Sequence, residues 1–306
     1  MEALWGLVAD ELSKVETIGG QRYVDRHRKR GKMLARERIE QLVDPDTPFL
    51  ELSPLAGWGS EFPIGAGVVM GIGIIEGVEV GITATDMTYR GGSSNPRTVE
   101  KSSRFFEIVA QNRLPWIALN ESAGADLPHQ ADIFVPGGAS FKHQTQLSKA
   151  GIPTIAVGFG PATAGGAYTP GMSDYTVFVK ERGTAYLGGP PLVKMAIDEI
   201  VDEETLGGAE MHSRVSGLSD YLAVDEMDAL RITREIVAHL RWEKLGPGPT
   251  EPADEPLYPT DELIGCASAD VRVPFDIREV YARVLDGSRF EEFKPLYGDK
   301  LICGWG

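Results

Sequence analysis

Short apolar runs that end in small residues recur along this chain, and they predict buried strands that lead into helices. Residues 65–85 hold two β-branched runs separated by Glu76 and Gly77, a pattern that predicts a hairpin of two antiparallel strands. Two single buried strands are predicted at 115–120 and 155–159. The other strands are expected at 49–52, 176–179, 184–187 and 297–306, and the helices at 1–18, 98–111, 141–150, 192–200, 225–240 and 276–287. Strands and helices alternate, which indicates an α/β fold.

Small residues crowd the C-terminal ends of the two single buried strands. ESAGA (121–125) follows the first strand, and TAGGAY (163–168) follows the second. A glycine pair alone is more typical of a turn than of an active site. In a repeating strand–helix layout, however, both junctions open on the same edge of the sheet, where ligands bind. Backbone amides near Ala123 and Gly166 could then converge on one oxygen, with the start of a helix adding the positive end of its dipole.

Composition narrows the classes of function. The 306 residues carry a formal net charge of −15 at pH 7, which opposes binding to nucleic acid and to anionic membranes. No apolar run approaches the ~20 residues of a membrane span. Acids stand near the N-terminus where a targeting segment would carry bases, so we expect a cytoplasmic protein. Two distant cysteines and five histidines without ligand spacing predict no metal site.

A basic cluster at 22–38 is out of character in so acidic a chain. Its eight Lys or Arg residues, against two acids, are Arg22, Arg26, Arg28, Lys29, Arg30, Lys32, Arg36 and Arg38. The cluster is either a solvated helix face or a phosphate-binding patch. It lacks the aromatic interleaving or the motif that would indicate nucleic-acid binding. Lys101, in the first turns of the helix predicted after a Gly- and Ser-rich loop, could add charge to an anion site.

Seven longer motifs cover nearly the entire chain. They are GKMLARERIEQLVDP (31–45), GGSSNPRTVEK (91–101), ESAGADLPHQAD (121–132), TAGGAYTPGMSD (163–174), GGPPLVKMA (188–196), LGGAEMHSRVSGLSDYLAVDE (206–226) and RVPFDIREVYARVLDGSRFEEFKPLYGDKL (272–301). Together they resemble the carboxyltransferase (β) subunits of biotin-dependent acyl-CoA carboxylases, within the crotonase superfamily. The pairing of TAGGAY with GPPLVK and LGGAEMH looks closest to the methylcrotonyl-, geranyl- and propionyl-CoA type.

The resemblance implies a crotonase-like spiral of ββα units and a mechanism. In that family, the thioester carbonyl of acyl-CoA sits between backbone amides that stabilise its enolate, and the enolate takes the carboxyl group released from carboxybiotin. Biotin itself is the base there, so no protein side chain has to be. Residue by residue, Gly165 and Gly166 match the main oxyanion site, and Ala123 and Gly124 match the second donor. The positions that resemble the part meeting the CoA phosphates are Arg28, Arg30, Lys32, Arg36 and Lys101.

The chain departs from the family pattern around the second donor. Ser122-Ala123-Gly124-Ala125 stands where the family commonly has Ser-Gly-Gly-Ala, which keeps the amide but adds a methyl group. Asn120, Glu121 and Asp126 also differ from the more usual residues. The identity of the acyl group is therefore open.

The resemblance also implies a domain organisation. Residues 1–245 would form the N-terminal acyl-CoA carboxyltransferase domain, 246–270 a Pro-rich acidic linker, and 271–306 a connecting segment with the first strand of a missing C-terminal domain. Family members complete the active site with that second half inside a homo-oligomer, a hexamer in the family, and work with a biotin carboxylase and biotin carboxyl carrier partner. We therefore expect a truncated chain, a fragment or one part of a split subunit, which binds acyl-CoA but does not complete carboxyl transfer alone.

Two other interpretations remain open at this point. A free-standing crotonase-type hydratase, isomerase or decarboxylase would need paired carboxylates near the glycine junctions, and Glu121 and Asp174 are the candidates. A non-catalytic assembly module would use the apolar end at 301–305 as an oligomer interface.

Overall fold

A computed structural model describes residues 1–243, 252–296 and 300–306. The chain divides into two compact units, Lys14–Leu245 and a second one made of Met1–Ser13 with Gly246–Gly306. Residues 244–251, which include the start of the predicted linker (246–270), and residues 297–299, the start of the last predicted strand, lie outside the described residues. The domain boundaries expected from the sequence stay a prediction.

The larger unit is built on an eight-stranded mixed sheet. Its order is β1-β2-β3-β4-β5-β6-β8, with β7 also paired to β5. The strands are β1 Leu50–Glu51, β2 Val68–Ile75, β3 Val78–Thr85, β4 Trp116–Ser122, β5 Thr154–Thr163, β6 Tyr175–Val179, β7 Thr184–Tyr186 and β8 Tyr221–Ala223. The hairpin expected at 65–85 is confirmed by the antiparallel pairing of β2 with β3. From β3 to β8 every pairing is parallel, so the carboxyl ends of these strands lie at one edge.

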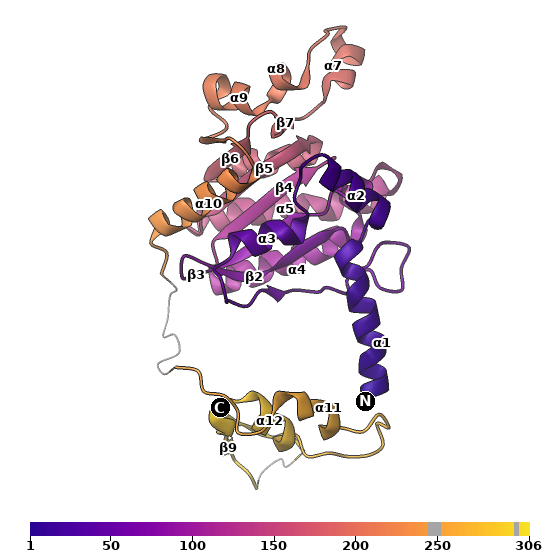
Figure 1. Cartoon of the computed structure of the whole chain (residues 1–306), viewed down its shortest axis with the longest axis vertical. Helices are drawn as coiled ribbons and strands as arrows, with labels where there is room; N and C mark the ends of the chain where they lie inside the picture. Colours follow the sequence, from indigo (N-terminus) through magenta and orange to yellow (C-terminus); the bar gives the residue numbers. More distant parts are fainter. Residues whose placement is uncertain (244–251, 297–299) are drawn as a thin grey trace. The chain divides into compact units, whose positions relative to one another are not determined.

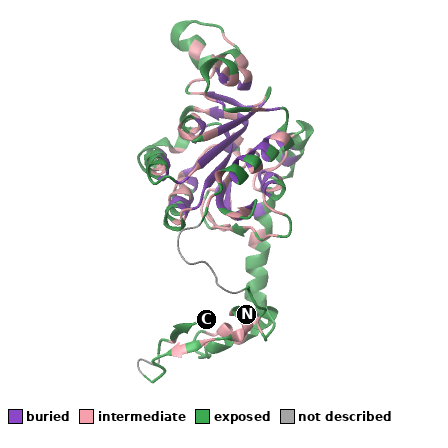
Figure 2. Cartoon of the chain, turned by 90° about the vertical axis from the view of Figure 1, so that its left-hand side faces the viewer, coloured by how far each residue is buried: buried purple, intermediate pink, exposed green. Residues whose placement is uncertain are grey.

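Helices cover both faces of this sheet. α3 (Ala35–Leu42) and α10 (Glu226–Leu240) pack on one face, and α4 (Pro96–Asn112) and α5 (Gln130–Lys149) on the other (Figure 1). Side chains of β4 alternate between the two layers, because successive residues of a strand point to opposite faces. The strands are buried between the helices, whose outer faces are exposed (Figure 2). A strand buried on both faces explains the continuous apolar runs in the sequence.

The sequence predicts the start of α4 well and the start of α5 poorly. Asn95 caps α4, accepting from the amides of Arg97 at 2.9 Å and Thr98 at 3.1 Å, and Pro96 occupies the first turn. α5 begins eleven residues before the predicted start at 141, since it opens at Gln130. The first half of α5 contains Pro136 and two following glycines, all poor helix formers, so the sequence does not predict a helix there.

The remaining elements of this unit are short. They are the helices α2 Gln21–Lys29, α6 Tyr168–Met172, α7 Pro190–Ile197, α8 Glu203–Gly207 and α9 Ala209–Met211, the 3₁₀ turns Lys14–Thr17, Arg90–Gly92, Leu127–His129 and Ala164–Ala167, and a π-helical turn His212–Ser216. A small apolar cluster of Ala162, Phe178, Ala185 and Ala209 packs around the second half of β5. α7 has no buried residue.

The smaller unit contains short elements without a buried core. Its helices are α1 Glu2–Ser13, α11 Leu263–Cys266 and α12 Arg278–Val284, with 3₁₀ turns Thr260–Glu262 and Asp286–Ser288 and the antiparallel strands β9 Glu291–Phe293 and β10 Cys303–Trp305. None of its described residues is buried. Ion pairs such as Arg278 with Glu292 at 2.8 Å join its elements. The helices predicted at 1–18 and 276–287 are thus present in shorter form.

Candidate functional site

The two glycine junctions meet at the carboxyl edge of the sheet. β4 and β5 are neighbouring parallel strands, so the residues that follow them emerge side by side. A Cβ built on Gly124 would lie 3.3 Å from the carbonyl oxygen of Thr163. A Cβ built on Gly166 would lie 3.2 Å from the Cβ of Ser122. Both distances are tighter than most side-chain contacts, so a larger residue at either position would require its neighbour to move by a few tenths of an ångström.

The junction after β5 is a tight turn. β5 runs on to Thr163, and the chain then forms a four-residue 3₁₀ turn, Ala164–Ala167, before α6. Ala164 has a positive φ of 53°, a strained conformation for a residue with a side chain. The amides that open a helical turn have no carbonyl partner within it, and here these belong to the exposed Ala164 and Gly165. Since the turn is short, its dipole is weaker than that of the helix expected from the sequence.

The junction after β4 is held by a serine. The Ser122 hydroxyl donates to the Gly92 carbonyl at 3.1 Å and accepts the Gly124 amide at 3.1 Å. Gly124 has a φ of 96°, which a residue with a side chain rarely adopts. The Ala123 amide donates to the Gly91 carbonyl at 3.0 Å. Both predicted second donors therefore already have acceptors, one a backbone carbonyl and the other a side-chain hydroxyl.

Asn120, which the sequence analysis named only as a departure from the family pattern, joins the two junctions. The Asn120 side-chain amide donates to the Gly166 carbonyl at 3.2 Å. Asn120 and Ser122 are two residues apart on β4, so they point to the same face of the sheet. Asn120 and Ser122 stand two residues apart at the end of a predicted strand, just before a run of small residues. This spacing could have indicated from the sequence that both side chains face the junctions.

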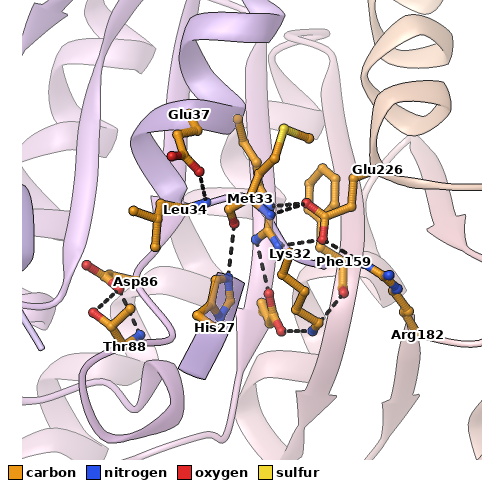
Figure 3. A network of polar contacts seen from close by, with 12 residues as sticks. His27, Lys32, Met33, Leu34, Glu37, Asp86, Thr88, Phe159, Arg182 and Glu226 are labelled. Carbon is orange, nitrogen blue, oxygen red and sulfur yellow. Dashed lines mark hydrogen bonds and ion pairs between the residues drawn. The ribbon is translucent and has the colours of Figure 1, made fainter. Parts of the chain in front are cut away.

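Glu121 points the opposite way, into a buried ionic network. Its carboxylate pairs with Lys32 and with Arg38, the latter at 3.0 Å, and its side chain is 0% exposed. Arg38, itself 1% exposed, also pairs with Glu226 at 3.0 Å. Figure 3 shows Lys32 beside Phe159, whose carbonyl it reaches at 3.2 Å, and Arg182 beside Glu226. The network lies beneath the junctions and ties β4 and β5 to α3 and α10.

Most of the predicted CoA-contacting side chains have partners within the protein. Arg28 pairs with Glu37 at 2.6 Å. Arg36 makes two hydrogen bonds to Glu51, at 2.7 and 2.9 Å.

Lys101 is buried and donates to the carbonyls of Gly65 and Val68, at 3.2 and 2.8 Å. Burial lowers the pKa of Lys101 to about 8, against the opposing influence of the Glu51 carboxylate. Arg30 is exposed and makes no ion pair within the described residues. The contact of these positions with CoA stays a prediction.

Two hollows lie near these basic residues. One, of about 670 Å³, is open to solvent and lined by α2: Arg22, Asp25, Arg26, Lys29 and Arg30. The other, of about 510 Å³, lies between the loop at 53–58 and the first turns of α4, and Lys101 forms part of its wall. Neither hollow is lined by the glycine junctions.

A polar cluster directly follows the Gly124 junction. The buried Asp126 accepts from Arg90 at 2.5 Å and from Nδ1 of His129 at 2.9 Å. The cluster thus places an imidazole and a carboxylate beside the Gly124 junction. The sequence analysis assigned no role to His129 or to its pairing with Asp126, although a spacing of three residues after a strand end was a usable signal.

The candidate carboxylates for hydratase chemistry do not meet at this edge. Glu121 is buried against two cations, on the sheet face opposite Asn120 and Ser122. Asp174 binds the amide of Thr154 at 2.8 Å, at the start of β5 and so at the far edge of the sheet. Glu121 and Asp174 therefore do not form the pair of carboxylates that would add or remove water.

Two surveys of the described residues bear on other classes of function. Within residues 1–243, 252–296 and 300–306, no group of three or more His, Cys, Asp or Glu side chains is arranged to hold a metal ion. Over the same residues no helix has the length and apolarity needed to cross a bilayer. The predictions of a metal-free and of a cytoplasmic protein stay predictions.

Comparison with known proteins identifies relatives over almost the whole chain. Residues 26–306 match the model of the carboxyl transferase domain. A probable biotin-dependent acyl-coenzyme A carboxylase beta2 subunit of Mycobacterium tuberculosis is 60% identical over 96% of this chain and 56% of its own length. The mitochondrial methylcrotonoyl-CoA carboxylase beta chain of Dictyostelium discoideum is 49% identical over 97% of this chain and 51% of its own. The chain thus spans about half the length of these relatives.

The fold agrees with solved structures of such proteins. The beta subunit of Pseudomonas aeruginosa geranyl-CoA carboxylase superposes with a TM-score of 0.82 at 40% identity, over 99% of this chain and 55% of that one. The crystal structure of transcarboxylase 12S gives a TM-score of 0.75 at 27% identity, over 99% and 60% of the two chains. The α/β, crotonase-like fold expected from the sequence is confirmed, and so is the resemblance on which it rested. The chain belongs to the carboxyl transferase domain family, and the relatives that it matches include beta subunits of biotin-dependent acyl-CoA carboxylases.

Proposed function

We propose that this chain is the acyl-CoA-binding half of a biotin-dependent carboxyltransferase. It would carry a carboxyl group from carboxybiotin to the α carbon, or the vinylogous γ carbon, of an acyl-CoA. The observation that carries the proposal is the meeting of two glycine junctions at the carboxyl edge of the sheet, where backbone amides can surround one oxygen. The relatives named as acyl-CoA carboxylase subunits support it.

The turn after β5 supplies the first donors in this proposal. The Gly165 amide, which opens the turn without a carbonyl partner in it, would hold the thioester oxygen. The Gly166 amide, which is less exposed and lies one position further into the turn, would be an additional donor. Loss of a proton from the acyl carbon moves negative charge onto that oxygen. Fixed amide donors then stabilise the charge without reorganising, which lowers the barrier to enolisation.

Gly124 is the better second donor, and Ala123 the weaker one. The Ala123 amide is bound to a backbone carbonyl that helps to hold the loop. The Gly124 amide is bound only to the neutral Ser122 hydroxyl. A charged enolate oxygen accepts roughly twice as strongly as a neutral group, so it can displace the hydroxyl where a thioester carbonyl competes less well. The interaction would therefore strengthen as the enolate forms, as catalysis requires.

Carboxybiotin, held by a partner subunit, would supply the carboxyl group. The residues of this chain would bind the thioester, orient its acyl carbon and stabilise the enolate. Biotin, when bound and freed of its carboxyl group, would supply the base that takes the proton from the acyl carbon. No ionisable side chain of this chain is then needed for proton removal, which agrees with the burial of Glu121 among cations.

Assembly with further copies and with a second half also belongs to the proposal. α7 has no buried residue, and Leu192, Met195 and Ile197 are more than half exposed. The described part of the smaller unit likewise lacks a buried side chain, so it gains a core only by packing against another surface. Transcarboxylase 12S, a structural relative that is described as a hexamer assembly, supports a homo-oligomer.

The test measures donors one at a time. In the full-length subunit with its biotinylated partner, replacing the Gly165 amide by an ester deletes the N–H without adding a side chain. We expect carboxylation to fall by about 10²- to 10³-fold, the usual loss for one oxyanion donor, with little change in acyl-CoA affinity. Gly165→Ala is the matched control, because its Cβ would lie 3.8 Å from Phe141 and the amide remains.

Two results would overturn this assignment. Turnover of the ester variant within a few-fold of wild type would remove the oxyanion role from Gly165. Absence of acyl-CoA binding to the wild-type chain in calorimetry, across a panel of acyl-CoAs, would remove the proposed function itself.

A further inference from the structure

The loop at 90–94 is hydrogen-bonded to the residues around the second donor. The Ser94 amide donates to the Gly124 carbonyl at 2.9 Å, and the Asp126 amide donates to the Ser94 carbonyl at 2.8 Å. The Ser122 hydroxyl binds the Gly124 amide at 3.1 Å from the other side. The peptide units on both sides of Gly124 are therefore held in place, one by a side chain and the other by this loop.

The loop at 90–94 begins in a conformation that needs outside support. Arg90 has a φ of 44°, in the left-handed region that residues with a side chain rarely adopt. Two glycines with φ values of 64° and 71° follow it, and glycine restrains the backbone less than any other residue. The loop therefore keeps its shape through contacts with neighbouring segments.

The Arg90 side chain supplies one of these contacts. Its guanidinium pairs with the Asp126 carboxylate at 2.5 Å, while Ser94 makes the backbone bonds at the other end of the same loop. The Asp126 side chain is 8% exposed, against 50% for that of Arg90. A buried carboxylate depends on its partners far more than an exposed one does. Removing Arg90 therefore disturbs Asp126 and, with it, the junction two residues away.

Asp126 has a second partner, which belongs to the following turn. Nδ1 of His129 lies 2.9 Å from the carboxylate oxygen that Arg90 binds, and the ring of Phe62 packs edge-on against His129 at 5.0 Å. These contacts remain when Arg90 is replaced. Since a half-exposed ion pair also adds little to overall stability, we expect the loss of Arg90 to act locally, on the loop at 90–94.

We propose that Arg90 is a positioning residue for the second oxyanion donor. Through its ion pair with Asp126 it holds the loop at 90–94 against the junction, and so it sets the direction of the Gly124 amide. A displaced amide loses more of its attraction for the charged enolate oxygen than for the neutral thioester, so the chemical step suffers more than binding does. The inference rests on the proposed function, in which the Gly124 amide is the second donor.

The test measures carboxylation of an acyl-CoA by the full-length subunit with its biotinylated partner. Arg90→Met removes the charge, whereas Arg90→Lys keeps the charge and loses the paired donors of the guanidinium. The matched control is Arg231→Met, since Arg231 on α10 is 57% exposed and also pairs with an acid, Asp228.

We expect Arg90→Met to lower kcat by about 10- to 100-fold, the range for a catalytic group that is displaced but not deleted. The KM for acyl-CoA and the melting temperature should stay as in wild type. Arg90→Lys should recover most of the lost turnover, and Arg231→Met should behave as wild type.

A second measurement determines whether Arg90 acts through Gly124. Replacing the Gly124 amide by an ester deletes this donor without adding a side chain. In that background Arg90→Met should cost no further turnover, because the effects of residues that act through one another do not add. An equal loss with and without the Gly124 N–H would overturn the inference.

Three other results would overturn it as well. Full turnover of Arg90→Met would show that the loop holds its position without the ion pair. A lost turnover accompanied by a lower melting temperature would assign Arg90 to stability alone. A raised KM with kcat unchanged would show that Arg90 binds the ligand directly. All of these leave the proposed function standing, because that depends on the Gly165 ester and on acyl-CoA binding by the wild-type chain.

Discussion

Ser122 is the residue on which the geometry of the site depends most directly. Its hydroxyl holds the Gly124 amide and the Gly92 carbonyl, each at 3.1 Å. It is 7% exposed, so water does not easily replace it. The Ser122 side chain thus holds the loop at Gly92 and the loop at Gly124 together, and it also lies close to Gly166.

Ser122→Ala is expected to lower the free energy of unfolding by about 1–3 kcal/mol, because it leaves a buried amide and a carbonyl without a partner. Urea denaturation of variant and wild type measures the difference. Ser213→Ala is the control, since that hydroxyl only bonds back to the Ala209 carbonyl one helical turn before it. An equal loss in both variants would show that Ser122 is an ordinary buried serine.

The sequence shows where these residues lie but not which way they point. Small residues after a buried strand predicted the junctions at 121–125 and 163–168, because only short side chains permit such turns. The direction of Glu121 depended on the register of β4 within the sheet, which a single strand does not reveal. The partners of Lys32 and Arg36 could not be inferred either, since the sequence gives no sign of pairing with Glu121 and Glu51.

At the scale of elements, α4 is attached to the loop before β2 by a buried cation. Lys101 lies in the second turn of α4 and donates to the carbonyls of Gly65 and Val68. Its pKa of about 8 lies below the ordinary value of 10.5 because burial disfavours the ammonium form. The docking of this helix therefore depends on pH.

Between about pH 8 and 10.5 the unfolded chain binds more protons at Lys101 than the folded chain does. The contribution of Lys101 to the free energy of unfolding should therefore rise with pH across this window, by about 3 kcal/mol in total. Below pH 8 the lysine is charged in both states and the contribution is constant. Urea denaturation of wild type and Lys101→Met at pH 7 to 10 isolates the effect, because the other titrating groups are common to both.

The same substitution at Lys142, an exposed residue of α5, serves as the control. The difference between wild type and Lys142→Met should not change with pH. If Lys101→Met gave the same flat difference, the ammonium group would be solvated in the folded protein.

At the scale of the whole molecule, the ionic network holds the layers of the larger unit together. Arg38, on α3, contacts Glu121 on β4 and Glu226 on α10. The network leaves no room for a side chain at the neighbouring strand, since a Cβ on Gly160 would lie 2.3 Å from the Glu121 carboxylate. Removing one member leaves buried charge without its partner.

Arg38→Met keeps much of the side-chain volume and removes the charge. We expect a loss of about 3–5 kcal/mol in the free energy of unfolding, as for other broken buried pairs. Chemical denaturation checks this, and Arg231→Met, on the outer face of α10, should leave the midpoint unchanged. A similarly unchanged midpoint for Arg38→Met would show that packing alone holds the layers.

The fold was more predictable than the assembly of its parts. The hairpin and the strand–helix order followed from periodicity and turn residues, which act locally. The short strand β7 was predicted, but its pairing with the second half of β5 depends on a contact between separate segments. The first half of α5 was missed because packing against α4 outweighs the poor propensity of Pro136.

β5 has different neighbours along its length. Ile155 to Gly158 pair with β6, whereas Pro161 to Thr163 pair with β7, and a shift of register between Asn120 and Ser122 on β4 falls at the same level. Ala162, in the outer stretch, still pairs with Ser122 of β4, so both stretches belong to one sheet. The glycine turn is therefore attached to the sheet through β4 on one side and through the three-residue strand β7 on the other. A change in the β7 segment can thus alter the position of this turn while the pairing of Ile155 to Gly158 with β6 stays as it is.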